Sequence, residues 1–111
     1  MISIALKLLI AHAIFDFVLQ PTAMAMGKNR HHTIHGSTEE QKMFPHWPYW
    51  LTSHALVHGG AVWFVTGSMT LGVVETGLHW IIDFVKCEER IGTHTDQFLH
   101  LATKAVYLFF I

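Results

Sequence analysis

The hydrophobic positions of the chain gather in four long segments that are separated by polar stretches. Pro21 ends the first segment, since proline disfavours a helical conformation of the residue before it. "TGSMT" at 66–70 separates the second segment from the third. The pattern predicts helices over about 2–20, 48–67, 71–89 and 96–111, with a loop over 21–47.

Two architectures are compatible with four such helices, a soluble bundle and a membrane bundle with a polar interior. Helices of this length cover roughly 23–33 Å, which brackets a bilayer core of about 30 Å. A soluble bundle would show a charged outer stripe on every helix. The segment "LVHGGAVWFVTGSMTLGVV" at 56–74 contains no Asp, Glu, Lys or Arg. The pattern therefore favours an all-α fold, a four-helix transmembrane bundle.

Composition limits the classes of protein that the chain can belong to. Its 111 residues suffice for a single domain, 1–111, and the net charge of −1 gives no reason to expect a nucleic-acid partner. The only cysteine, Cys87, excludes an internal disulfide. The unusual feature is the ten histidines, which are spread along the chain instead of forming one run.

The positive charges predict how the bundle is oriented. Lys28, Arg30 and Lys42 lie between the first two helices, and Lys86 and Arg90 lie between the last two. These two connections share one side of a four-span protein, and positive loops face the cytoplasm. Both termini are therefore expected outside, on the opposite side.

Polar residues interrupt the apolar segments at a constant spacing. The three aspartates of the chain each have a histidine four residues away, and the second helix carries a histidine pair at the same spacing in "HALVH". Residues at this spacing lie on one helix face. The four pairs are His12 and Asp16, His54 and His58, His79 and Asp83, and Asp96 and His100.

The four pairs predict a shared metal centre inside the bundle. Ionisable groups within a membrane face the interior and bind one another or an ion, and imidazole together with carboxylate suits zinc, iron or manganese. The ligands are too many for one tetrahedral zinc, so we expect one or two divalent ions, with zinc preferred. The expected ligands are His12, Asp16, His58, His79, Asp83, Asp96 and His100.

The loop histidines are a weaker candidate site. The loop histidines His31, His32 and His35 in "HHTIH" could bind a metal at the surface. Histidines in a loop beside Lys28 and Arg30 are more often ordinary polar loop residues that bind no metal. A short helix at 37–42 is also expected in this loop.

Four motifs resemble one family in the same order along the chain. They are "HAIFDFVLQP", "HALVHG", "ETGLHWIIDFVK" and "TDQFLHL". The family consists of small bacterial and phage membrane proteins and is catalogued as domain of unknown function 3307. Its polar positions correspond to His12, Asp16, Gln20, His54, His58, His79, Asp83, Lys86, Asp96, Gln97 and His100, with Glu75 as a further polar position. The resemblance implies a multi-pass protein of the bacterial inner membrane.

Three functions fit these residues. The first is a metal-dependent hydrolase acting on a phosphoryl or acyl bond of a lipid-linked or amphiphilic substrate at the cytoplasmic side, with Glu75 as first candidate for the general base and His54 as second. A looser likeness to membrane-bound metal-dependent hydrolases points the same way. The second is a non-enzymatic protein whose network is structural and which binds a host membrane partner. The third, haem ligation by paired histidines, does not need the carboxylates. A homo-oligomer is compatible with each.

Overall fold

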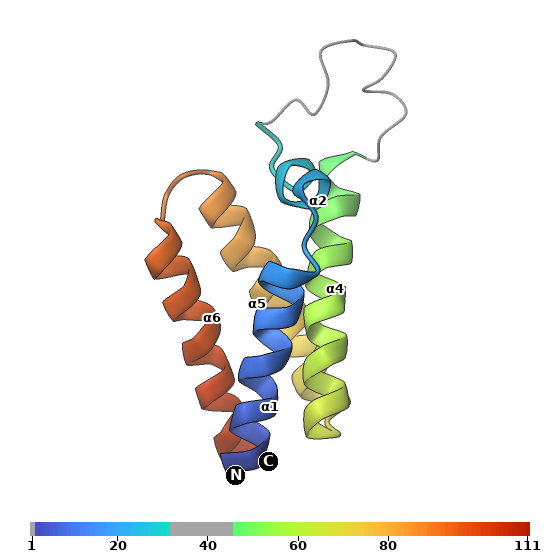
Figure 1. The fold of residues 1–111 in the computed structure, drawn as a ribbon, viewed down its shortest axis with the longest axis vertical. Coiled ribbons are helices and arrows are strands. Elements are labelled where there is room, and N and C mark those ends of the chain that lie inside the picture. Colours follow the sequence, from blue (N-terminus) through green and yellow to red (C-terminus); the bar gives the residue numbers. More distant parts are fainter. Residues whose placement is uncertain (1, 32–45) are drawn as a thin grey trace.

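Four long helices form a bundle in the computed structural model, which describes residues 2–31 and 46–111. They are α1 (Ile2–Ala13), α4 (Trp47–Thr66), α5 (Met69–Cys87) and α6 (Thr93–Tyr107), and they lie side by side (Figure 1). A short helix, α2 (Thr22–Gly27), lies at one end of the bundle beside α4. No β-strand occurs in the described ranges, so the prediction of an all-α fold is confirmed.

The chain passes up and down the bundle, so that consecutive long helices run in opposite directions. As a result the two chain ends lie together at the end opposite α2 (Figure 1). A 3₁₀ turn, η2 (Leu108–Phe110), follows α6 at that end. The connections between α1 and α4 and between α5 and α6 share the α2 end, as the sequence pattern predicts.

The first helix ends differently from the regular helix expected over 2–20. After Ala13 the chain continues as a π-helical turn, η1 (Ile14–Val18), in which the amide of Leu19 donates to the Ile14 carbonyl over 2.7 Å. Such turns are wider than an α-helical turn and are frequent at functional sites. Asp16 lies in the middle of this turn and is buried.

A helix also occurs where the sequence suggested only loop. The segment 22–27, "TAMAMG", forms α2 because Ala and Met favour helix and Pro21 precedes it in the extended conformation of an N-cap. The expected short helix at 37–42 lies outside the described residues.

The turn between α4 and α5 is short and capped on both sides. Gly67 adopts a left-handed conformation with φ 74°, and its amide donates to the Trp63 carbonyl over 2.8 Å. This ends α4 in the way that glycine favours. The hydroxyl of Ser68 then accepts from the Leu71 amide over 3.2 Å and caps α5.

Two glycines let α4 and α5 approach closely. A Cβ atom on Gly59 would lie 2.6 Å from the carbonyl oxygen of Gly72, and one on Gly72 would lie 2.8 Å from that of Gly59. Gly60, the next residue of α4, faces open space. The α4–α5 contact therefore depends on the absence of a side chain at Gly59 and Gly72.

The bundle interior is apolar at one end and polar over the rest of its length. An apolar cluster of Leu8, Val62, Leu71 and Tyr107 fills the end near the termini. Beyond it the buried side chains are largely polar: His12, Asp16, Lys28, His54, His58, Glu75, His79, Asp83, Asp96, His100 and Lys104.

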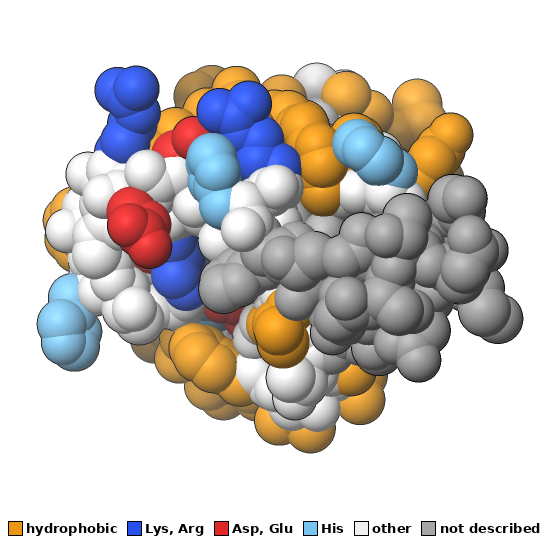
Figure 2. Space-filling view, turned by 90° about the horizontal axis from the view of Figure 1, so that it is seen from above, with side chains coloured by type: hydrophobic (Ala, Val, Ile, Leu, Met, Phe, Trp, Pro, Cys, Tyr) orange, Lys and Arg blue, Asp and Glu red, His pale blue; other side chains and the backbone are white. Residues whose placement is uncertain are grey.

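Large hydrophobic side chains lie on the outside instead. Phe64 is 90% exposed and Phe109 is 84% exposed, whereas His79 and His100 are fully buried. Figure 2, which views the α2 end, shows hydrophobic side chains along the rim and charged and histidine side chains on the end face. Within residues 2–31 and 46–111, no helix combines the length and the apolar character needed to cross a membrane. The transmembrane part of the predicted fold class stays a prediction.

Candidate metal centre

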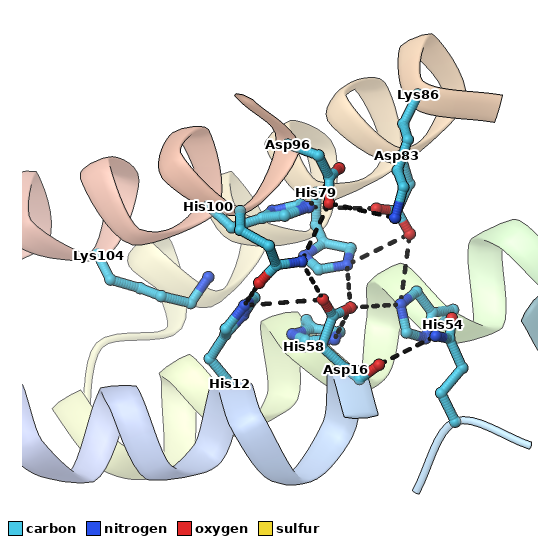
Figure 3. Close-up of polar contacts among 12 residues, drawn as sticks. His12, Asp16, His54, His58, His79, Asp83, Lys86, Asp96, His100 and Lys104 are labelled. Carbon is cyan, nitrogen blue, oxygen red and sulfur yellow. Dashed lines mark hydrogen bonds and ion pairs between the residues drawn. The ribbon is translucent and has the colours of Figure 1, made fainter. Parts of the chain in front are cut away.

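The four rows of polar residues meet in the interior of the bundle, between the apolar cluster and α2. The first row comes from α1 and η1, the second from α4, the third from α5 and the fourth from α6 (Figure 3). The members of each row are four residues apart and so share one face, and in the bundle that face points inward. Every member of the four predicted pairs is buried.

Three imidazoles converge on one carboxylate oxygen at the centre of this network. The Nε2 atoms of His54, His58 and His79 lie 3.2, 3.5 and 3.9 Å from Oδ1 of Asp16 (Figure 3). One ligand atom from each of the four residues lies within 4.8 Å of the others. We call Asp16, His54, His58 and His79 the first group.

The donor chemistry of the first group fits a metal ion. Nε2 of His58 and Nε2 of His79 are buried and have no hydrogen-bond partner. Buried polar atoms are rarely left without a partner, and an ion between these nitrogens would satisfy both. His54, which the sequence suggested as a base, therefore lies among the possible ligands, together with Asp16, His58 and His79.

A second group shares the same interior. Nε2 of His100 lies 3.2 Å from Oδ1 of Asp83 and 3.2 Å from Oδ1 of Asp96. One ligand atom from each of these three residues also lies within 4.8 Å of the others. Oδ2 of Asp83 lies 3.3 Å from Nε2 of His54 and 3.5 Å from Nε2 of His79. Asp83 thus links the second group, Asp83, Asp96 and His100, to the first.

Lysine side chains lie close to the carboxylates of the second group but not to Asp16 of the first group. Lys28 is buried, and its Nζ donates to Oδ2 of Asp83 over 2.8 Å and to Oε1 of Gln20 over 2.7 Å. Nζ of Lys86, a half-exposed side chain, lies 3.6 Å from Oδ2 of Asp96. No ammonium lies within salt-bridge distance of Asp16 among the described residues.

Glu75 lies deeper, between the first group and the apolar cluster. Its Oε1 lies 3.3 Å from Nδ1 of His79 and accepts from Nζ of Lys104 over 2.6 Å, while Oε2 accepts from the Tyr107 hydroxyl over 2.7 Å. Glu75, His79 and His100 also form a third cluster with ligand atoms within 4.8 Å of one another. Both oxygens of Glu75 are already hydrogen-bonded.

His12 has a different surrounding from the other predicted ligands. Its Nε2 lies 2.9 Å from Oε1 of Gln97 and 3.7 Å from Oδ2 of Asp16. The Gln97 amide in turn donates to Asp16 over 2.8 Å and to Asp96 over 3.0 Å. His12 belongs to none of the three clusters that could hold an ion. It contacts the centre through Gln97 and Asp16.

Sequence reasoning missed the burial of Lys28, which looked like a loop charge, because no periodic pattern connects it to the four rows. Lys104 continues the row of α6 four residues after His100, as the sequence indicates, and it is buried there. Tyr107, seven residues after His100, lies on the same face of α6, but its hydrogen bond to Glu75 was not predicted.

A polar pocket of about 450 Å³ lies at the α2 end and is lined by Asn29, His31, Cys87, Glu88 and Glu89. The guanidinium of Arg30 and the imidazole of His31 bond to Glu88 beside it. These hydrogen bonds, that of Arg30 first, lower the pKa of Glu88 to about 2. His32 and His35, the other loop histidines of the sequence analysis, lie outside the described residues.

Comparison with known proteins gives one match. The family model described as "Protein of unknown function (DUF3307)" matches residues 4–111. No curated protein and no solved structure matches the chain.

Proposed function

Since the chain belongs to the DUF3307 family, described only as proteins of unknown function, we propose its function from its own geometry. It is a membrane-embedded metalloprotein that holds one divalent ion on the first group. The convergence of three Nε2 atoms on Oδ1 of Asp16 carries this proposal, because two of those nitrogens are buried without any other partner.

The charge of the interior supports a bound cation. Four carboxylates, those of Asp16, Glu75, Asp83 and Asp96, are buried together with two lysines, Lys28 and Lys104. With every histidine neutral, the formal charge of this interior is therefore −2, and with His100 protonated between Asp83 and Asp96 it is −1. In both cases the buried charge is negative. An uncompensated buried charge is strongly unfavourable, so the interior favours a bound cation.

The distribution of side chains supports a lipid environment. A water-soluble protein rarely exposes large apolar patches, yet each long helix exposes large hydrophobic side chains, such as Leu6, Phe64, Ile81 and Phe98, while four carboxylates and two lysines are buried inside. That arrangement suits a bilayer, in which polar groups face the bundle interior. Two of the polar residues that lower the hydropathy of α4, His54 and His58, are among the buried ones.

The ligand types suit zinc, iron or manganese, with zinc first. When bound, such an ion would polarise a phosphoryl or acyl group and acidify a water molecule. We therefore propose hydrolysis of an amphiphilic substrate that enters from the α2 end, where the polar pocket beside Cys87 lies one helical turn from Asp83. In this proposal Glu75 orients His79 instead of acting as general base, because both of its oxygens are occupied.

A purely structural ion is the second candidate function. Four protein ligands close the coordination sphere of a tetrahedral zinc, as in structural sites, and the first group offers four buried residues. The protein would then act by binding a membrane partner.

Elemental analysis of the purified protein in detergent tests the ion. We expect about one ion per chain in the wild-type protein and in His94→Leu, which changes an exposed histidine, and loss of the ion in His58→Leu, which changes a buried one. Equal metal content in all three, with helicity unchanged by circular dichroism, would refute the first group as the site. Hydrolysis of a lipid phosphoester or thioester by the wild-type protein but not by His58→Leu would support the enzyme, and equal background rates would support the structural ion.

A further inference from the structure

The second group is the strongest remaining candidate for a ligand site. We propose that Asp83, Asp96 and His100 form a second cation site, which the Lys28 ammonium, bound to Oδ2 of Asp83, keeps free of a metal ion. This inference takes from the proposed function only the ion in the first group. Its new element is that Lys28 prevents a second metal ion from binding, so that the protein binds one ion per chain.

Lys28 enters the interior from outside the four-helix bundle. It directly follows α2, and its ammonium reaches Asp83 on α5 over 2.8 Å. Gly27 permits this approach, since a Cβ atom there would lie 2.7 Å from the Trp50 ring on α4. The ammonium is thus delivered by a short element that packs against the bundle from outside the four long helices.

The second group offers ligand atoms that Lys28 does not satisfy. Oδ1 of Asp96 is buried and has no hydrogen-bond partner. This atom and Oδ1 of Asp83 each lie 3.2 Å from Nε2 of His100, so that two carboxylates and one imidazole face a common point. Two carboxylates and an imidazole suit manganese, iron or zinc.

The two groups are close enough to affect one another. Oδ2 of Asp83 contacts Lys28 and also lies within 3.5 Å of Nε2 of His54 and of His79. A lysine ammonium is a compact single positive charge, so at Asp83 it offsets the carboxylate and disfavours a second divalent ion nearby. Without that ammonium, no fully buried positive side chain offsets the two carboxylates of the second group. We expect a metal ion to bind there in its place.

Metal stoichiometry tests this proposal. Lys28→Met and the more conservative Lys28→Gln, purified and dialysed against Mn²⁺ or Zn²⁺, should each hold one more ion per chain than the wild-type protein. The matched control Lys7→Met, which changes an exposed lysine of α1, should hold the wild-type number. Adding Asp96→Asn to Lys28→Gln should remove the extra ion.

The outcomes separate the two proposals. An extra ion that depends on Asp96 supports the second site even if the first group proves empty in the wild-type protein. The same number of ions in the wild-type protein and both Lys28 variants would overturn it. So would an extra ion that persists with Asp96→Asn.

A measurement on the wild-type protein covers the case in which neither variant folds. At Mn²⁺ concentrations far above those used for dialysis, the ion should compete with Lys28 for Asp83, displace it and expose its amine. Modification of Lys28 by an amine-acylating reagent, read by mass spectrometry, should then rise with Mn²⁺ concentration, while modification of the exposed Lys7 stays constant. Constant modification of Lys28 would overturn the proposal.

Discussion

Nδ1 of His79 faces Oε1 of Glu75 over 3.3 Å, one helical turn away on α5. A proton on Nδ1, donated to the carboxylate, leaves the lone pair of His79 on Nε2, which is the atom that faces Asp16. Carboxylates hydrogen-bonded to ligand histidines commonly fix the ring in this way. Lys104 and Tyr107 hold the carboxylate from the other side.

Replacing Glu75 should therefore weaken ion binding without removing a ligand of the first group. We expect Glu75→Gln to raise the dissociation constant of the ion by roughly 10–100-fold, and Tyr107→Phe to raise it less. The measurement is competition with a chelator. Tyr49→Phe, which changes an exposed tyrosine, is the control, and an affinity in Glu75→Gln equal to that of the control would contradict the role of Glu75.

The two neighbouring glycines of α4 should respond in opposite ways to alanine. Gly59→Ala forces a methyl group against the Gly72 carbonyl and should destabilise the bundle by about 1–3 kcal/mol. Gly60→Ala meets open space and should be neutral or stabilising by up to ~1 kcal/mol. Thermal unfolding in detergent followed by circular dichroism compares them, and equal midpoints would mean that α4 and α5 do not need the close approach.

The proposed orientation can be read from cysteine accessibility in intact cells. In a Cys87→Ser background, a membrane-impermeant thiol reagent should label Met69→Cys, at the start of α5, and spare His94→Cys, near the start of α6. The positive charges near α2 and after α5 predict, for a membrane-embedded bundle, that the α2 end faces the cytoplasm. Labelling of His94→Cys alone would invert the orientation, and labelling of both would argue against a closed membrane barrier between them.

Glu88, outside the long helices, should titrate far below its ordinary range. Arg30 and His31 lower its pKa to about 2. Because the folded pKa is depressed, any stability from this contact is complete above the unfolded value near 4.5 and is lost as pH falls towards about 2. Carbon-13 NMR of the Glu88 carboxyl should show this, and Arg30→Gln should return the pKa towards its ordinary value. An unchanged titration in Arg30→Gln would show that Arg30 is not the cause.

The inward rows of the long helices were predictable from the sequence, since residues four apart share a helix face whatever surrounds them. His79 and Asp83 on α5 are an example, and both are buried as that spacing requires. The spacing does not determine which partner each of these side chains contacts in the interior. His12 has the same spacing to Asp16 as the other pairs, yet its nearest partner is Gln97.

Tertiary contacts explain the features that the sequence pattern could not predict. Lys28 is buried because α2 packs near Trp50, and no local pattern encodes that contact. The π-helical turn around Asp16 changes the hydrogen bonding of a segment whose composition is typical of a regular helix. Both features act on the position of a carboxylate, and in the proposed metal centre the carboxylate positions decide which ions fit.

The apolar cluster of Leu8, Val62, Leu71 and Tyr107 separates the polar interior from the end of the bundle near the termini. One side chain from each of the four long helices contributes to this layer, next to Glu75. The layer offers no ligand for an ion apart from the Tyr107 hydroxyl, which is already bonded to Glu75. An ion crossing the bundle from end to end would therefore require these four side chains to separate.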